Sequence, residues 1–522
     1  MKKEQVKHWA DSIAERVIRQ RGDKSKYVCA SGISPSGTIH IGNFREIITT
    51  DLVVRALKDK GKDVRFIYSW DDFDRLRKVP AGVPKEFKDY IGMPYSDIPD
   101  PFGKEKSYAE HFEKELEEGI SGLGFDVEFI RQSVKYKNRE YKEGIKKALT
   151  ERKKIMDILN KYRKEPLSEN WYPLHVYCEK CRRDDTQVVF YDGNYKVEYM
   201  CKCGNKAEVD FSKKGIVKLP WRVDWPMRWA HEKVDFEPGG KDHSMPGSSR
   251  TTGVEIVNAV YHEKEPIYQM YDFIGVKGIG GKMSGSTGNA FSPKDVLEIY
   301  EPELVRWLFA GTRPNAEFSI SFDLDVIKNY EDFDKCERIF FGQHEAGEKE
   351  KAKQSRIYEL SYPGKTPGAM PYQPSFRHLT GVIQIYENDI KEAAKHYKAE
   401  LANKEDEKRF NVRAQCAINW LREYAPADMK FRIQKTVPKN IKLGAKEKEA
   451  LKLLAKSLKE KELDEKSLFN EFYEICKQTG IENKQFFKAA YLVLIEKERG
   501  PKLAPFILTI GKERVVKLFD SL

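Results

Sequence analysis

The stretch that most constrains the fold lies near the start of the chain, where three kinds of segment follow one another. Residues 26–31 (KYVCAS) have the composition of a strand, residues 31–43 (SGISPSGTIHIGN) are rich in glycine, serine and proline, and the apolar residues after His40 recur at helical spacing. A second apolar stretch, residues 63–70, ends at Asp71 and Asp72. A strand, a tight loop, a helix and a second strand within about 50 residues form a βαβ unit, which predicts a parallel α/β sheet.

The loop between the first strand and the helix has the composition of a ligand-binding turn. Ligands of open parallel sheets bind at the carboxyl ends of the strands, where helix N-termini favour negative charge. Gly32 and Gly42 allow close approach of the backbone, and Pro35 stiffens the turn. The spacing matches neither a G-x-G-x-x-G fingerprint nor a P-loop. From these residues alone, a phosphate-binding loop and a purely structural βα turn both remain open.

A second glycine- and serine-rich segment, residues 275–289 (GVKGIGGKMSGSTGN), contains Lys277 and Lys282. A lysine on a mobile loop can close over phosphate groups as negative charge develops on them. Loops of this composition are more often linkers. The pairing with the first loop is what favours nucleotide binding.

Four of the eight cysteines are clustered: Cys178 and Cys181 form a C-x-x-C pair, and Cys201 and Cys203 form a C-x-C pair after 19 intervening residues. Two close pairs of thiolates have the spacing of a tetrahedral zinc ribbon. No open coordination position is apparent, which favours a structural zinc ion over a catalytic one. A vestigial site without metal and a redox pair are the alternatives.

Charge and hydropathy narrow the class of protein further. The formal charge of +11 suits a polyanionic partner, although it also describes an ordinary solvated surface. No run of about 20 apolar residues occurs, so we expect no membrane segment and a cytoplasmic location. In the last third, Phe469, Phe472, Ile475 and Cys476 fall at helical spacing, and stripes of this kind are usually core.

Two short motifs carry a resemblance to a known family. HIGN (His40 to Asn43) and KMSGS (Lys282 to Ser286) resemble the HIGH and KMSKS signatures of class I aminoacyl-tRNA synthetases, in the same order. Residues 69–80, 218–253 and 319–334 make nearly the whole chain similar to the archaeal type of class I lysyl-tRNA synthetase. Asn43 and Gly285 depart from the two signatures, so Lys282 carries most of the second loop's positive charge, with Lys277 as a helper.

The resemblance implies a multidomain α/β fold built on a Rossmann-type nucleotide-binding domain. Its first half is expected over residues 1–155 and its second half over residues 216–290, with a zinc-binding connective insertion at residues 156–215 between them. A stem-contact segment is expected at residues 291–345, and an α-helical anticodon-binding domain at residues 346–522. A monomer is expected.

The implied activity is ATP-dependent ligation of L-lysine to tRNA-Lys through a lysyl-adenylate, with first transfer to the 2′-hydroxyl of the terminal adenosine. Mg²⁺ would accompany ATP, and Zn²⁺ would occupy the insertion. The expected catalytic residues are His40, Asn43, Lys282 and Ser284, and Pro35 and Gly42 join them in binding ATP. For Ser284, simple loop polarity explains the residue as well as direct contact does.

Lysine recognition requires a polar or anionic group for the ammonium and apolar or aromatic walls for the stem. The expected substrate-binding residues are Gly32, Ser34, Trp221, His243 and Tyr271. Each aromatic ring suits core packing equally well, and Asp71 and Asp72 suit either amine binding or capping of a turn.

Two alternative functions remain open, a class I synthetase of the glutamyl type and a noncatalytic tRNA-binding paralogue. A DNA-binding zinc protein is less favoured, because the cysteine cluster interrupts an enzyme-like sheet. The sequence assigns no residue to the reading of the anticodon.

Overall fold

The computed structural model describes residues 7–277 and 291–522. The chain forms two compact units. The N-terminal unit comprises residues 1–297, 302–320 and 336–366, and the C-terminal unit comprises residues 298–301, 321–335 and 367–522. No helix among the described residues is both long and apolar enough to cross a membrane.

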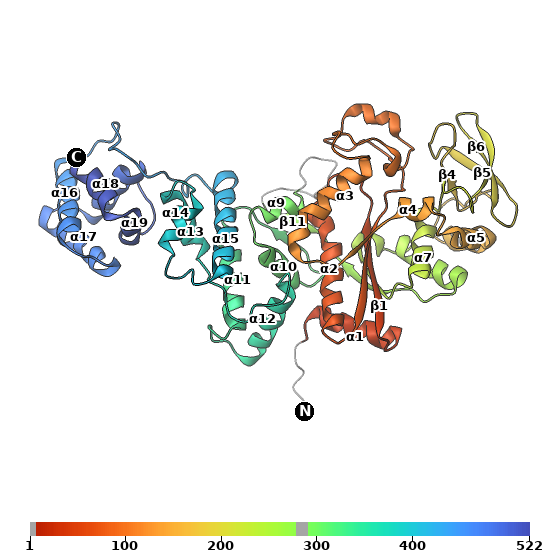
Figure 1. Ribbon diagram of the computed structural model, residues 1–522, viewed down its shortest axis with the longest axis horizontal. Coiled ribbons are helices and arrows are strands. Elements are labelled where there is room, and N and C mark those ends of the chain that lie inside the picture. The colour runs from red at the N-terminus through yellow and green to blue at the C-terminus, as the bar shows by residue number, and fades with distance from the viewer. Residues whose placement is uncertain (1–6, 278–290) are drawn as a thin grey trace. The chain divides into compact units, whose positions relative to one another are not determined.

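A five-stranded parallel sheet organises the N-terminal unit (Figure 1). Its strands, in spatial order, are β10 (Ile267–Tyr271), β9 (Phe236–Gly240), β1 (Lys26–Ile33), β2 (Asp63–Trp70) and β3 (Glu128–Arg131). β1 and β2 pair in parallel along their whole length, from Lys26 opposite Asp63 to Ile33 opposite Trp70. The predicted βαβ unit is therefore confirmed, and so is the parallel α/β fold class.

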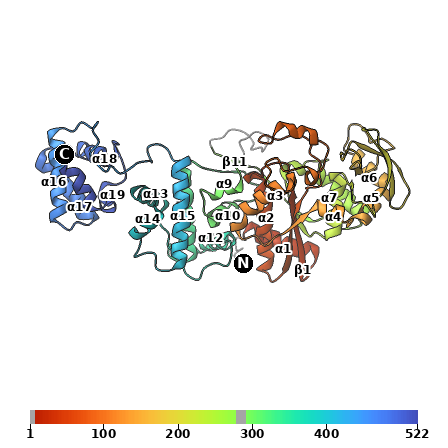
Figure 2. The same ribbon diagram turned by 45° about the horizontal axis from the view of Figure 1, so that its top comes forward.

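Helix α2 (Ile41–Lys58) connects β1 to β2 and packs on both strands. Most residues of α2 are buried, and helix α1 (Trp9–Arg21) packs against both α2 and β10 (Figure 2). The buried Arg45 donates to the backbone carbonyls of Asp272 and Ala316, at 2.8 and 2.7 Å. These bonds fix the first turns of α2 against the segment that follows β10.

A small antiparallel sheet lies within residues 156–215, the range predicted for the insertion. Its strands, yellow in Figure 1, are β5 (Thr186–Tyr191), β6 (Lys196–Cys201) and β7 (Lys206–Asp210). Strands β4 (His175–Val176) and β8 (Val217–Lys218) pair antiparallel and close the base of this region.

The other helices and strands of the N-terminal unit surround these two sheets. They are α3 (Tyr108–Gly119), α4 (Gln132–Lys137), α5 (Lys142–Thr150), α6 (Arg152–Asn160), α7 (Trp221–Glu232), α8 (Ser249–Ile256), β11 (Ile274–Val276), α9 (Pro293–Leu297), α10 (Pro302–Ala310), β12 (Phe318–Ile320) and α12 (Glu348–Ser361). Helix α11 (Asp325–Phe340) contributes residues to both units.

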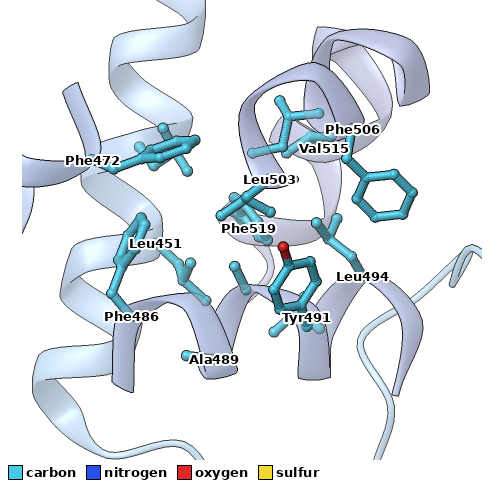
Figure 3. Close-up of a cluster of buried hydrophobic side chains, with 14 of the residues drawn as sticks. Leu451, Phe472, Phe486, Ala489, Tyr491, Leu494, Leu503, Phe506, Val515 and Phe519 are labelled. Carbon is cyan, nitrogen blue, oxygen red and sulfur yellow. The ribbon is translucent and has the colours of Figure 1, made fainter. Parts of the chain in front are cut away.

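The C-terminal unit is helical, as predicted. Its helices are α13 (Phe376–Ile385), α14 (Ile390–His396), α15 (Lys404–Glu423), α16 (Ala445–Glu460), α17 (Glu465–Thr479), α18 (Asn483–Ile495), α19 (Leu503–Ile510) and α20 (Lys512–Asp520). Figure 3 shows the apolar cluster that joins the last of these helices, including Leu451, Phe472, Phe486 and Phe519.

One predicted core residue of this unit is exposed. Phe472, Ile475 and Cys476 are buried in the stripe predicted for α17, but Phe469 has 45% of its surface exposed. Leu468 is fully buried and occupies the inward position of that turn. Because successive residues of a helix are rotated by about 100°, Phe469 turns away from the core.

Candidate active site

The first predicted motif forms the start of α2, at the carboxyl edge of the parallel sheet. β1 ends at Ile33, and His40 is the N-cap of α2, with its Nδ1 accepting a hydrogen bond from the backbone N–H of Gly42 at 3.1 Å. Asn43 therefore lies in the first turn of the helix. Pro35 is buried in the preceding loop. The positive end of the helix dipole at this edge suits a phosphate group.

The segment that follows the second motif in the chain lies beside the first motif. Lys282 and Ser284 lie outside the described residues, but both flanking segments are fixed. The backbone N–H of Lys277 donates to the carbonyl of Ile320 at 3.0 Å, and the carbonyl of Phe291 accepts from the N–H of Ile41 at 2.7 Å. The chain that follows the second motif is thus bonded to the residue next to His40.

A small cavity of about 70 Å³ opens at the same edge, between β1, β2, β9 and helix α7. Trp221 and Trp225 form part of its wall, with parallel rings whose centroids are 5.0 Å apart. The ring of His243 lies 5.8 Å from that of Trp225. Gly32 contributes backbone to the lining, and a Cβ atom at this position would come within 2.5 Å of the carbonyl oxygen of Ser69. The cavity therefore has aromatic walls and a glycine where no side chain fits.

Glu46, which sequence reasoning missed, brings a carboxyl group to this cavity. Its Oε1 accepts from the backbone N–H of Gly32 at 2.9 Å, and its Oε2 accepts from the hydroxyl of Tyr271 at 2.6 Å. Burial raises the pKa of Glu46 to about 8, although both hydrogen bonds act in the opposite direction. A cation that entered the cavity would favour the ionised form of this carboxyl.

The three other acidic residues of the cavity already have partners, and Glu232 pairs with Arg65 at 2.6 Å. Asp71 is paired with Arg228 at 2.7 Å, and Glu237 accepts hydrogen bonds from the indole nitrogens of Trp225 and Trp229. Among the residues that the structure describes, no lysine or arginine forms an ion pair with Glu46. Glu46 is therefore the carboxyl group of the cavity best placed to accept a cationic ligand.

Only some of the predicted substrate-binding residues line this cavity. Gly32, Trp221 and His243 line it, and Tyr271 reaches it through Glu46. Ser34 is half-buried in the loop after β1 and does not line the cavity.

Asp71 and Asp72, left between two roles by the sequence, differ in the structure. Asp71 lines the cavity, whereas Asp72 accepts from the backbone N–H of Ser133 at 2.7 Å and so caps the first turn of α4. Glu46 had one sequence signal, since it follows Asn43 by three residues and so lies on the same side of the predicted helix.

The four clustered cysteines converge as predicted from their spacing. Their sulfur atoms all lie within 4.8 Å of one another, with 3.7 Å between Cys178 and Cys203 and 3.6 Å between Cys181 and Cys201. Zinc–sulfur bonds of about 2.3 Å in a tetrahedron place sulfur atoms roughly 3.8 Å apart. The side-chain amide of Asn205 also points to Cys178 Sγ, at 3.5 Å. These distances fit a four-thiolate zinc site.

The fold and these two motifs define a class I aminoacyl-tRNA synthetase. Residues 7–364 match the family described as tRNA synthetases class I (K), and the chain belongs to that family. Residues 419–518 match an anticodon binding domain.

The relatives that match over full length agree on a more particular group. Proteins named Lysine–tRNA ligase from Borrelia garinii and Treponema pallidum are 47% and 46% identical to this chain, over 98% of it and over 99% and 98% of their own lengths. The protein of the same name from Pyrococcus horikoshii is 46% identical, over 98% of both chains. The resemblance stated from the two motifs is confirmed.

Proposed function

We propose that this protein ligates L-lysine to tRNA-Lys at the expense of ATP, through a lysyl-adenylate that is first transferred to the 2′-hydroxyl of the terminal adenosine. The observation that carries this proposal is the cavity with Glu46 and Tyr271 beside the N-terminus of α2. The names of the full-length relatives support lysine over the glutamyl alternative.

In this proposal, the carboxylate of Glu46 accepts a hydrogen bond from the side-chain ammonium of the substrate lysine. The hydroxyl of Tyr271 holds the Glu46 carboxylate in position. The rings of Trp221 and His243 cover the methylene stem, since aromatic faces attract both apolar groups and nearby cations. The backbone around Gly32 lies against the substrate. For Ser34 we propose only that its backbone lies near the substrate, because its side chain does not line the cavity.

The adenylation step asks this chain mainly to position reactants and to offset charge. The substrate carboxylate attacks the α-phosphate of ATP, and pyrophosphate leaves. We assign phosphate binding to His40, Asn43 and the positive end of the α2 dipole, with Pro35 and Gly42 shaping the loop. Lys282, with Ser284 beside it in sequence, offsets the charge on the leaving pyrophosphate. Mg²⁺ bound with ATP would neutralise part of the same charge.

The insertion is proposed to hold one structural zinc ion on Cys178, Cys181, Cys201 and Cys203. Native mass spectrometry should find one zinc per chain, and a Cys181→Ser/Cys201→Ser variant should lose it. Cys476→Ser is the matched control, because Cys476 is buried in the C-terminal unit. A correctly folded wild-type chain that contains no metal would defeat this assignment.

The activity itself is tested by ATP–pyrophosphate exchange with each amino acid, with and without tRNA, followed by aminoacylation. Exchange and aminoacylation specific for lysine are expected. Exchange with glutamate and none with lysine would overturn the choice of amino acid. Binding of tRNA without exchange or aminoacylation for any amino acid would favour the noncatalytic paralogue. We propose that the protein carries out this activity in the cytoplasm as a monomer.

A further inference from the structure

Helix α17 exposes two aromatic rings side by side. Phe469 and Tyr473 have 45% and 42% of their surfaces exposed, and their ring centroids are 5.1 Å apart at an interplanar angle of 72°. In the C-terminal unit, which lies entirely within the described residues, no other phenylalanine, tyrosine or tryptophan is as exposed as these two. An exposed pair of rings in contact is an uncommon arrangement on a helix whose other side is core.

The exposed rings are not needed for the packing of α17. The opposite side of the helix carries Leu468, Phe472 and Ile475, which are buried, and Figure 3 shows Phe472 directed into the apolar cluster. An amphipathic helix ordinarily covers its outer face with polar side chains. Phe469 and Tyr473 therefore point to a ligand for this face.

Polar side chains frame the two rings along one line of the helix. Lys466, Phe469, Asn470, Tyr473 and Lys477 follow one another at intervals that bring them to the same face, and all five are exposed. We call these five residues the α17 stripe.

Both lysines of the α17 stripe remain available to an anion. Neither makes an ion pair within residues 7–277 and 291–522, whereas the nearby Lys461 and Lys512 are paired with Glu471 and Glu462. Glu474 lies to one side of the line through the lysines, and Asp464 and Glu465 lie next to Lys466 at the start of the helix, without an ion pair to it. A cation thus stands at each end of the aromatic pair.

We propose that the α17 stripe is the surface on which unpaired bases of the anticodon loop of tRNA stack. Single-stranded RNA is recognised by stacking of bases on aromatic rings, by hydrogen bonds to base edges and by cations near the phosphates. Phe469 and Tyr473 supply the rings, Asn470 supplies an amide for base edges, and Lys466 and Lys477 supply the cations.

Two further observations favour RNA over a protein partner. The stripe lies inside residues 419–518, which match an anticodon binding domain. A protein interface would need a broad apolar patch, whereas the stripe offers two rings between two lysines that make no ion pair. The inference rests on the proposed function, because it requires tRNA to be the substrate.

The test uses the full-length protein and an anticodon stem-loop RNA that carries 2-aminopurine at one anticodon position, since stacking quenches 2-aminopurine fluorescence. Phe469→Leu/Tyr473→Leu removes both rings but keeps apolar side chains. Tyr473→Phe keeps both rings and is the conservative control. Phe190→Leu is the matched control for loss of an exposed ring, because Phe190 is 50% exposed on β5.

We expect the double leucine variant to bind the stem-loop at least about tenfold more weakly and to lose the fluorescence change, since both rings on which bases would stack are removed. Tyr473→Phe and Phe190→Leu should bind like the wild type. In aminoacylation, the KM for tRNA should rise while the KM for lysine stays unchanged.

The lysines are tested separately by the salt dependence of binding. Lys466→Ala/Lys477→Ala should reduce the slope of log Kd against log salt by about one to two, because each phosphate contact contributes about one. Lys452→Ala/Lys456→Ala, on the exposed face of α16, removes the same charge as a control. Equal effects of the two pairs would overturn the role of the stripe lysines.

Failure of this inference differs from failure of the proposed function. If the wild type charges tRNA with lysine but the double leucine variant binds the stem-loop as tightly as the wild type, the α17 stripe is not the anticodon surface. Self-association that disappears in the same variant would then assign the stripe to a second copy of the chain. If the wild type charges no tRNA with lysine, the proposed function fails first.

Discussion

Glu46 is the carboxyl group that suits the candidate active site to a cationic ligand. Glu46 reaches the cavity from α2 and is held there by Gly32 and Tyr271. The other acidic residues of the cavity pair with Arg228 or Arg65, or accept hydrogen bonds from indole N–H groups. Its selectivity for a cationic ligand therefore depends on Glu46.

Replacement of Glu46 by glutamine tests that dependence. Glu46→Gln keeps the volume and one acceptor but removes the charge, so lysine binding should weaken by about 2–5 kcal/mol, the cost of losing one partner of a buried ion pair. Calorimetric titration of lysine measures the change. Glu128→Gln is the control, because Glu128 pairs with Arg65 on the surface. Undiminished lysine binding by Glu46→Gln would remove Glu46 from the site.

The same carboxyl predicts a pH dependence. The pKa of Glu46 is raised to about 8 by burial, so at lower pH the empty site is protonated and must release a proton when the ammonium binds. The Kd for lysine should therefore rise by up to about tenfold for each pH unit below 8 and level off above it. Titrations between pH 6 and 9 check the slope, which should disappear in Glu46→Gln. A flat profile in the wild type would contradict the assignment.

Lys282 is tested by its own substitution. Lys282→Ala should reduce ATP–pyrophosphate exchange by about 10²–10³-fold, the effect of losing one preorganised charge-stabilising group. The affinity for tRNA should stay nearly unchanged, because the loss concerns the leaving pyrophosphate. Lys294→Ala, on the exposed side of α9, is the control. If Lys282→Ala lost as much tRNA affinity as exchange activity, Lys282 would have a role in binding tRNA instead.

At the scale of elements, sequence pattern predicts what depends on local order. The βαβ unit over residues 26–70 and the cysteine cluster were predictable, because helical spacing and ligand spacing are properties of short segments. The role of Glu46 was not, because its contact with Tyr271 joins residues 225 positions apart in the chain. Phe469 was misplaced for a related reason: a stripe of apolar residues does not show which of two adjacent positions, 468 or 469, faces the core.

Helix α15 carries a buried ion-pair network that offers a test of stability. Arg413 is completely buried and contacts Glu301 at 2.9 Å and Asp334 at 2.8 Å. Burial alone would raise the pKa of Glu301, but Arg409 and Arg413 outweigh it and hold that pKa below its ordinary value. Burial raises the pKa of Asp334 in spite of Arg413, so Glu301 is the carboxyl of this network that the arginines hold ionised.

Arg413→Ala removes the ion-pair partner of the buried Asp334 and one of the two arginines that contact Glu301, so the free energy of unfolding should fall by about 3–5 kcal/mol. Urea denaturation followed by circular dichroism measures it. Arg422→Ala, on the same helix, removes an exposed arginine paired with Glu423 and should change stability little. Similar losses in both variants would show that the network does not stabilise the fold.

At the scale of the whole molecule, the predicted class of fold holds, while the five predicted segments stay a prediction. The chain divides into two compact units, and each unit draws on several separate stretches of sequence. Composition alone does not reveal such interleaving, because residues 298–301 and 321–335 join the C-terminal unit through contacts with distant helices. The anticodon-binding helices were predictable as a class, but not the face that they expose.

The net charge predicts how the whole chain responds to salt. With a formal charge of +11 and tRNA as a polyanion, log Kd for tRNA should rise linearly with log salt, and affinity should fall by about 10³–10⁵ between 50 and 200 mM salt if six to ten phosphates are contacted. Filter binding measures the slope. Lysine binding at the small cavity should depend far less on salt. A salt-independent Kd for tRNA would contradict a phosphate-dominated interface.

The close approach of β2 to Gly32 has a consequence for the history of the family. A side chain at position 32 would collide with the carbonyl of Ser69, and the backbone N–H of Gly32 already donates a hydrogen bond to Glu46. Selection can therefore redesign the walls of the cavity but cannot vary this piece of main chain. Descendants that came to accept another amino acid would have kept a bare glycine at position 32 and changed the residues around it.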